Sequence, residues 1–285
     1  MQENPAVEQL VDNSPSHTRV LDLRTRYYQA GEKEGVPLRE ENFVQRHVNM
    51  KLPVHQTALI LVDVWKSGSI DSVMERTEST IKNSIVPVLH EAHKIGMTVI
   101  HAPKPIVAIK FKRCQRLCTP DDLRYIENAI NKGVNPKPSS NWPPTDFINR
   151  SGEYNQFRHG RNRHPAGRPI DYQFSPYIDV HDNDFVIANA RQLQEVLANN
   201  GILHLIYAGF ATNLCMLNRD YGIRAMYQRA YNIILLRDAT TGIEFPDTLQ
   251  NLMVTEIAIR EVEQHFGFSA SNKDFFQASH GLTSD

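Results

Sequence analysis

The run Thr57-Ala58-Leu59-Ile60-Leu61-Val62-Asp63-Val64 decides the fold of this chain. An unbroken apolar run of this length, rich in branched aliphatic residues, is typical of a strand that is buried on both faces. Such strands occur in parallel sheets that helices cover from both sides. The aspartate near the end of the run is then expected at the carboxyl edge of the sheet.

Working outward from this run, strand-like and helix-like patterns alternate along most of the chain. Short apolar stretches predict strands over residues 97–101, 184–188, 204–209 and 232–236, and an alternating stretch predicts an edge strand at 19–24. Helical spacing predicts helices over residues 75–94, 192–200, 214–229 and 248–266, the first of them kinked or broken at Pro87. This alternation predicts an α/β fold with a doubly wound, mainly parallel six-stranded sheet and helices on both faces, in a Rossmann-like three-layer arrangement.

The domain organisation follows from where this regularity holds. We expect one domain over residues 51–270, preceded by an N-terminal extension or arm at 1–50 and followed by a tail at 271–285. Between residues 104 and 177 the periodic pattern is lost, and the second half of that segment is rich in Pro, Asn, Arg and Gly. A segment of this length inside an α/β domain predicts an insertion or lid over the sheet.

Composition excludes several classes of protein. The 285 residues are 41% hydrophobic and carry a net charge of -1, so electrostatic attraction to nucleic acid or to anionic membranes is not expected. The first 20 residues have no apolar signal segment, and no stretch approaches the roughly 18 apolar residues of a membrane span. Three cysteines are too few for a disulfide framework. We therefore expect a cytosolic protein with free thiols and a small-molecule substrate.

Cys215 is the candidate nucleophile. It follows the strand predicted at 204–209 and a short polar turn, and it opens the next predicted helix. The unpaired N–H groups and partial positive charge of a helix start lower a thiol pKa and can hold an oxyanion. Asp63 is suited to take the thiol proton and return it to a leaving group. From position alone, a buried structural cysteine and a turn-capping aspartate are equally open.

Two motifs resemble the isochorismatase-like cysteine hydrolases. They are Ala-Leu-Ile-Leu-Val-Asp-Val at residues 58–64 and Gly-Phe-Ala-Thr-Asn-Leu-Cys at residues 209–215. Residues 219–224 and 235–240 are similar to longer members of that superfamily. The resemblance covers about residues 55–103 and 178–265, and it is weak over the insertion.

The resemblance implies roles for particular residues. Cys215 matches the nucleophile and Asp63 the acid/base. The peptide bond between Phe210 and Ala211 matches a non-proline cis bond, and the N–H groups of Ala211 and Cys215 would form an oxyanion hole. Thr212 and Asn213, which lie between these donors, are expected to bind substrate.

One member of the family triad is missing from its usual place. Family members usually carry a lysine at the end of the strand that ends here in Val186-Ile187-Ala188-Asn189. Lys104, Lys110 and Lys112 follow the second strand instead. We expect Lys110 to act as the replacement, because a loop leaving that strand starts beside Asp63. The alternative is a solvated surface lysine.

Residues just after the aspartate often bind metal or orient substrate in the family. Here Trp65-Lys66-Ser67-Gly68-Ser69 offers no Asp-x-His spacing, so we expect no metal and no cofactor. Trp65 is expected to form a wall of the substrate pocket or a helix contact.

These expectations combine into one functional hypothesis. A cysteine hydrolase would act on a C–N bond of a small amide, ureide or related molecule through a thioester on Cys215. Two alternatives stay open: a degenerate family member that binds a ligand or partner without turnover, and a vinyl-ether hydrolase that needs no cysteine nucleophile. The family resemblance also implies a homo-oligomer, either a dimer or a tetramer.

Overall fold

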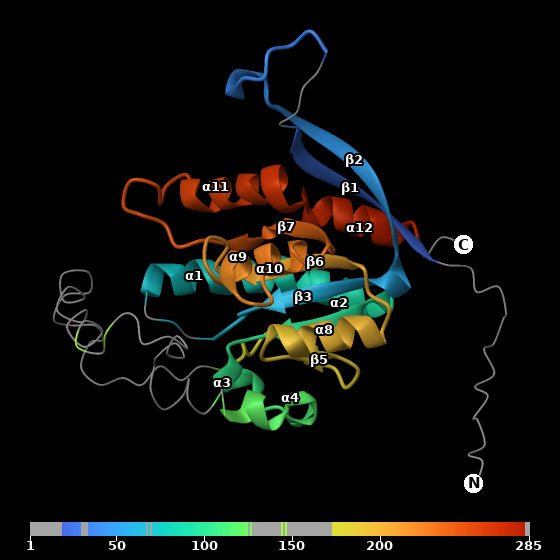
Figure 1. The fold of residues 1–285 in the computed structure, drawn as a ribbon, viewed down its shortest axis with the longest axis vertical. Coiled ribbons are helices and arrows are strands. Elements are labelled where there is room, and N and C mark those ends of the chain that lie inside the picture. The colour runs from blue at the N-terminus through green and yellow to red at the C-terminus, as the bar shows by residue number, and fades with distance from the viewer. Residues whose placement is uncertain are drawn as a thin grey trace.

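A central eight-stranded sheet organises the described part of the chain (Figure 1). The computed structural model describes residues 19–29, 34–66, 68, 70–124, 126, 144, 146 and 173–282. The strands are β1 (Val20–Gln29), β2 (Val44–Pro53), β3 (Thr57–Val62), β4 (Thr98–Ala102), β5 (Phe185–Val186), β6 (His204–Phe210), β7 (Asn232–Thr241) and β8 (Phe268–Ala270). Their order across the sheet is β2-β1-β8-β7-β6-β3-β4-β5.

The parallel core of the sheet confirms the predicted fold class, but the predicted number of strands is wrong. The strands from β8 across to β5 pair in parallel, whereas β1 pairs antiparallel with both β8 and β2. The sequence missed β8 because it is only three residues long. It missed β2 because most of that strand is exposed, and it therefore lacks the alternating apolar pattern.

The helices of the described residues lie on both faces of the sheet. They are α1 (Asp71–Thr80), α2 (Val86–Lys94), α3 (Pro105–Ala108), α4 (Lys112–Leu117), α8 (Ala190–Asn199), α9 (Cys215–Asn218), α10 (Ile223–Tyr227), α11 (Met253–Glu261) and α12 (Asn272–His280). Two π-helical segments, η3 (Ile81–Ile85) and η4 (Val262–Phe266), adjoin them, and η1 (Glu40–Asn42) and η2 (Val54–Gln56) are single 3-10 turns.

Strand β3 serves two separate cores because successive side chains of a strand point to opposite faces. Leu59 and Leu61 pack in the cluster that contains Ile85 of η3. Ile60 packs in the other cluster, with Leu193 of α8. Both faces of β3 are therefore dry, which explains the unbroken apolar run in its sequence.

The helix predicted after β3 is irregular before Pro87. α1 leads into the π-helical turn η3, and α2 follows with Pro87 in its first turn. Proline has no N–H to donate and is tolerated at a helix start. The widened turn accordingly falls just ahead of the proline.

The helix predicted over residues 214–229 is wrong, because the chain breaks between α9 and α10. At Gly222 an added Cβ would lie only 2.9 Å from the Met216 carbonyl oxygen. The backbone thus folds back on itself between Arg219 and Gly222. This break shapes the candidate site described below.

The segments outside the predicted domain pack against it. β1 and β2 form a hairpin that rises beyond the helices (Figure 1). Ser271 and Asp274 form a capping box at the start of α12, and Phe275 of that helix is fully buried. The boundaries 1–50, 51–270 and 271–285 stay predictions. Most of the predicted insertion or lid at 104–177 lies outside the described residues; its first part forms α3 and α4.

Candidate active site

Asp63 lies at the carboxyl edge of the sheet, directly after β3. Its side chain is fully buried, and its N–H donates to the Ala102 carbonyl at the end of β4, at 3.1 Å. Its backbone has a φ of 47°, in the left-handed region that Asp adopts more readily than most residues. Gly209 permits the close approach of β6 to this turn, since a Cβ there would lie 2.0 Å from the Val62 carbonyl oxygen.

Cys215 is the first residue of α9 and is half-buried. Burial raises the pKa of its thiol to about 11, with the negative charge of Asp63 as the next cause; the positive charges of Arg219 and Lys104 act in the opposite direction. The lowered pKa expected from the helix start is therefore wrong. α9 has only four residues, and its small dipole is outweighed by burial and by Asp63.

Arg219 pairs with Asp63. It lies in the break between α9 and α10, and its Nη2 donates to Asp63 Oδ2 at 3.0 Å. The neighbouring Asp220 accepts a hydrogen bond from the Ala190 N–H, at 2.9 Å, at the start of α8. The sequence reasoning missed Arg219, although it lies only four residues after the cysteine. In a continuous helix Arg219 would lie one turn after Cys215 on the same face, so this four-residue spacing is the signal that could have found it.

Tyr221 completes the buried surroundings of the pair. Its hydroxyl donates to the Pro103 carbonyl at 3.1 Å. Burial, followed by the charge of Asp63, holds the phenol pKa well above its ordinary value. Tyr221 is therefore a neutral hydrogen-bond donor beneath the site.

The lysines considered as replacements for the family lysine follow β4. Lys110 is exposed in the turn after α3, and its catalytic role stays a prediction. Lys104 is half-buried after β4, close enough for its charge to lower the Cys215 pKa. Among the described residues, Arg219 forms an ion pair with the Asp63 carboxylate.

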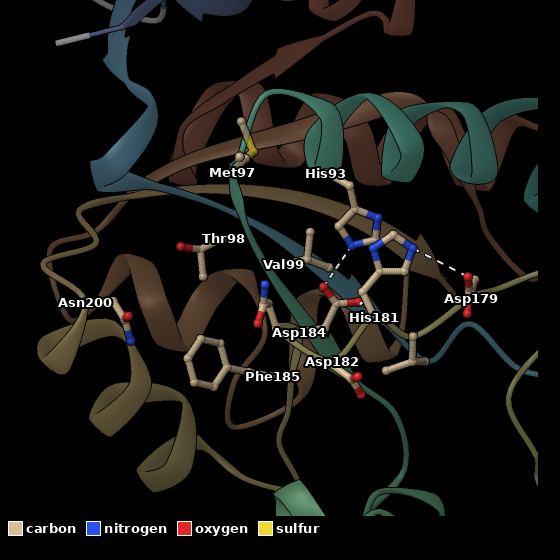
Figure 2. A pocket seen from close by; sticks show the side chains of 13 residues that line it. His93, Met97, Thr98, Val99, Asp179, His181, Asp182, Asp184, Phe185 and Asn200 are labelled. Carbon is tan, nitrogen blue, oxygen red and sulfur yellow. Dashed lines mark hydrogen bonds and ion pairs between the residues drawn. The ribbon is translucent and has the colours of Figure 1, made fainter. Parts of the chain in front are cut away.

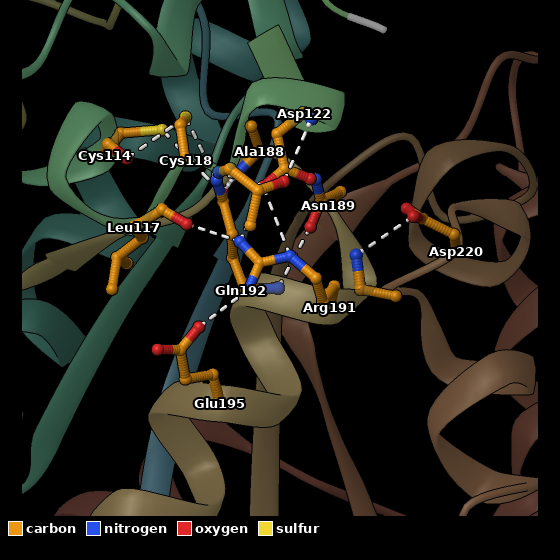
Figure 3. Close-up of polar contacts among 12 residues, drawn as sticks. Cys114, Leu117, Cys118, Asp122, Ala188, Asn189, Arg191, Gln192, Glu195 and Asp220 are labelled. Atoms are coloured by element: carbon orange, nitrogen blue, oxygen red, sulfur yellow. Dashed lines mark hydrogen bonds and ion pairs between the residues drawn. The ribbon is translucent and has the colours of Figure 1, made fainter.

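Asn189, at the place where the family carries its lysine, is engaged in a structural network (Figure 3). Its side-chain oxygen accepts from the Gln192 N–H at 2.9 Å and caps α8, while its Nδ2 donates to Asp122 at 2.6 Å. Arg191 donates to the other Asp122 oxygen at 2.6 Å. These contacts attach the chain after α4 to the start of α8.

The predicted oxyanion and substrate residues surround the turn before Cys215. The Phe210–Ala211 bond is cis, as the resemblance implies. Thr212 is buried, with its hydroxyl 2.7 Å from that of Thr240. Asn213 accepts from the Ile243 N–H at 3.0 Å. It stays a prediction that Ala211 and Cys215 donate to an oxyanion and that Thr212 and Asn213 bind substrate. In the structure, the side chains of Thr212 and Asn213 already form hydrogen bonds within the protein.

Trp65 lies on the residue that precedes the cis bond. Its ring stacks on Phe210 with centroids 5.5 Å apart, and its backbone forms a bridge with Phe174. Both predicted roles, a pocket wall and a helix contact, concern this half-buried ring. The observed contact is with a strand residue, and binding of substrate by Trp65 stays a prediction.

A second polar cluster surrounds Asp184, beside β4 and directly before β5 (Figure 2). The Asp184 carboxylate accepts hydrogen bonds from Nε2 of His93 and of His101 at 2.8 and 2.9 Å, and from the backbone N–H of His181 at 2.9 Å. His93 and His181 stack with ring centroids 3.7 Å apart. A groove of about 760 Å³ beside the cluster is also lined by Thr98 and Val99 at the amino end of β4. Neither Asp63 nor Cys215 lines this groove, so it is distinct from the candidate active site.

In the part of the chain that the structure describes, no group of three His, Cys, Asp or Glu side chains could hold a metal ion. No helix there has the length and apolar character needed to cross a bilayer.

The fold and the site define a class: a three-layer α/β protein with a cysteine and a buried aspartate at the carboxyl edges of adjacent parallel strands. The sequence profile of the isochorismatase domain matches residues 57–267. The chain therefore belongs to the isochorismatase family, which confirms the resemblance of its two motifs.

Individual relatives are more distant. A ureidoacrylate amidohydrolase RutB from Agrobacterium fabrum is 27% identical over 112 residues, covering 37% of this chain and 45% of that protein. The match thus spans less than half of the relative. A cysteine hydrolase structure from Pseudomonas syringae pv. phaseolicola has a TM-score of 0.50 at 16% identity, covering 80% of this chain and 94% of that one. An isochorismatase family protein from Burkholderia thailandensis has a TM-score of 0.47 at 16% identity, covering 79% and 96%.

Proposed function

We propose that the protein is a hydrolase that cleaves a C–N bond in a small amide, ureide or related molecule through a thioester on Cys215. The observation that carries the proposal is the proximity of Cys215 to the buried Asp63 carboxylate, whose charge raises the thiol pKa. The name of the distant relative, an amidohydrolase, supports the choice of a C–N bond.

The proposed reaction uses one proton carrier. Asp63 takes the proton of the Cys215 thiol as sulfur attacks the substrate carbonyl carbon. The N–H groups of Ala211 and Cys215 hold the resulting oxyanion. The C–N bond then breaks, and Asp63 gives its proton to the leaving nitrogen, which leaves a thioester on Cys215.

The second half of the reaction reverses these proton transfers. Water attacks the thioester carbonyl while Asp63 accepts a proton from it. The C–S bond breaks, the product leaves as a carboxylic or carbamic acid, and the proton returns to the sulfur of Cys215. These steps use no cofactor.

The test is the loss of the nucleophile. We expect Cys215→Ala to abolish turnover on a panel of small primary amides and ureides, and to abolish the substrate adduct seen by intact-protein mass spectrometry after rapid acid quench. Cys118→Ala is the matched control, because Cys118 is also half-buried but lies at the end of α4. Turnover that persists in Cys215→Ala would disprove the thioester mechanism. Turnover of a vinyl ether by both wild type and Cys215→Ala, without turnover of the panel, would favour vinyl-ether hydrolysis.

A binding protein without turnover is the second candidate. It is favoured by the replacement of the family lysine with Asn189, whose side chain caps α8. In that case the panel would yield neither turnover nor adduct, although the wild-type protein would still bind a ligand.

A further inference from the structure

The buried pair of Asp63 and Arg219 has one spare acceptor and one spare donor. Arg219 Nη2 contacts Asp63 Oδ2, whereas Asp63 Oδ1 and Arg219 Nε are buried without a hydrogen-bond partner among the described residues. The Asp63 side chain is 0% exposed. Leaving such polar atoms unsatisfied costs free energy, so retained examples call for a functional explanation.

We propose that Arg219 is the functional cation of this site, and that Asp220 is the residue that positions it. The proposal rests on the proposed function, because it assigns Arg219 the task of stabilising the charges of Asp63 and of the Cys215 thiolate. Asp63 Oδ1 is then the atom that receives the thiol proton.

The position of Asn189 supports a relocated cation. A lysine at that point would have to reach Asp63 from the end of β5, but the Asn189 side chain instead caps α8 and contacts Asp122. The start of the same helix also helps to position Arg219, because the Ala190 N–H donates to Asp220, the residue that follows Arg219. The start of α8 thus contributes to the site through the chain that carries Arg219.

The local backbone makes this arrangement specific. Gly222 allows the chain to turn back against the end of α9, since an added Cβ there would lie 2.9 Å from the Met216 carbonyl oxygen, and α9 ends after four residues. Arg219 leaves the helix at that break and reaches Asp63. The Asp220 carboxylate also lies at the amino end of α8, where the helix dipole favours a negative charge.

An arginine changes the chemistry available to the site. Guanidinium cannot release its proton at physiological pH, so Arg219 supplies a fixed charge and takes no part in proton transfer. Every proton that leaves Cys215 must therefore rest on Asp63 until the leaving nitrogen or the sulfur takes it. A lysine could exchange protons, and Arg219 cannot.

Alkylation of Cys215 by iodoacetamide across pH tests the role of Arg219. Because the charge of Arg219 lowers the thiol pKa, Arg219→Gln should reduce the alkylation rate at pH 9 about tenfold, which corresponds to a shift of about one pKa unit. Arg219→Lys keeps the charge and should stay within about threefold of wild type. Peptide mass spectrometry separates Cys215 from Cys118, and Arg224→Gln, an exposed arginine of α10, is the control.

A second pair of variants separates the electrostatic effect of Arg219 from a folding defect. Arg219→Gln leaves Asp63 buried without a counter-charge, so the comparison is repeated with Asp63→Asn and Asp63→Asn/Arg219→Gln, which have no such charge. With iodoacetamide at pH 9, Cys215 of the double variant Asp63→Asn/Arg219→Gln should react about tenfold more slowly than Cys215 of Asp63→Asn. Equal rates would overturn the role of Arg219. Alkylation needs no turnover, so this outcome is distinct from failure of the thioester mechanism.

Asp220 is tested by the same readout. Asp220→Ala should shift the alkylation profile in the direction of Arg219→Gln by about threefold, as expected for loss of one hydrogen bond, and Asp220→Asn should restore it through its amide oxygen. Glu256→Ala, which removes a partly exposed acid of α11, should leave the profile unchanged. A wild-type profile in Asp220→Ala would overturn the positioning role.

Discussion

At the scale of single residues, the site consists of a thiol and its proton acceptor rather than a preformed thiolate. With a pKa of about 11, Cys215 is protonated at neutral pH, chiefly through burial and then through Asp63. Slow alkylation near pH 7 is therefore expected of an active enzyme as well as of an inactive relative. An adduct formed from substrate separates the two, and the alkylation rate alone does not.

Asp63 should have opposite effects on reactivity and on catalysis. Asp63→Asn removes the negative charge next to Cys215, so we expect iodoacetamide to react about tenfold faster at pH 8.5. Hydrolysis should nevertheless fall by at least about a hundredfold, because an amide cannot carry the proton. Both rates are measured on one preparation, with the exposed Asp247→Asn as control. Slower alkylation in Asp63→Asn would contradict the electrostatic assignment.

At the scale of elements, sequence reasoning succeeded where burial imposed a pattern. The apolar run of β3 and the Gly209–Cys215 motif fixed the strand, the turn and the cysteine in relation to one another. The helical spacing places Arg219 one turn after Cys215, but its contact with Asp63 depends on the break at residues 219–222. That break involves the close local packing of Gly222 and the contact of Asp220 with the start of α8, neither of which the pattern contains. The helix cap at Asn189 likewise depends on contacts with a distant segment.

The Asp184 cluster should make stability depend on pH. Burial lowers the pKa of His101 below its ordinary 6.5, so the unfolded chain binds a proton that the folded chain does not. The stabilising contribution of neutral His101 to the free energy of unfolding is therefore present above pH 6.5 and is lost as the pH falls below 6.5. The pKa of Asp184 is also lowered, despite burial, by its bonds to His101 and His93. The stabilising contribution of ionised Asp184 to the free energy of unfolding is present above pH 3.8 and is lost on further acidification.

We expect urea unfolding to detect this link between α2, β4 and the chain before β5. Asp184→Asn should lower the free energy of unfolding by about 3 kcal/mol at pH 7.5, because it breaks a buried charged network. The wild type should be less stable at pH 5.0 than at pH 7.5. Asp182→Asn is the control, since that side chain is fully exposed. An Asp184→Asn protein as stable as this control would contradict the account.

At the scale of the whole molecule, the open question is how much of the chain forms one cooperative unit. The isochorismatase profile ends at residue 267, and the sequence predicts a tail after residue 270. In the structure, Phe275 of α12 lies in the same core cluster as Leu59 and Leu61 of β3. β1 contributes Leu21 and Leu23 to that cluster as well, so segments near both ends of the described chain pack in the same core as β3.

If α12 is part of the cooperative unit, Phe275→Ala should lower the free energy of unfolding by about 3–5 kcal/mol through loss of burial and formation of a cavity. Phe245→Ala is the matched control, because Phe245 is 63% exposed, and it should change stability by less than about 0.5 kcal/mol. Circular dichroism and tryptophan fluorescence should report one coincident urea transition in both variants. A small effect of Phe275→Ala, or a separate early transition, would identify residues 271–285 as a tail that the hydrolase core does not need.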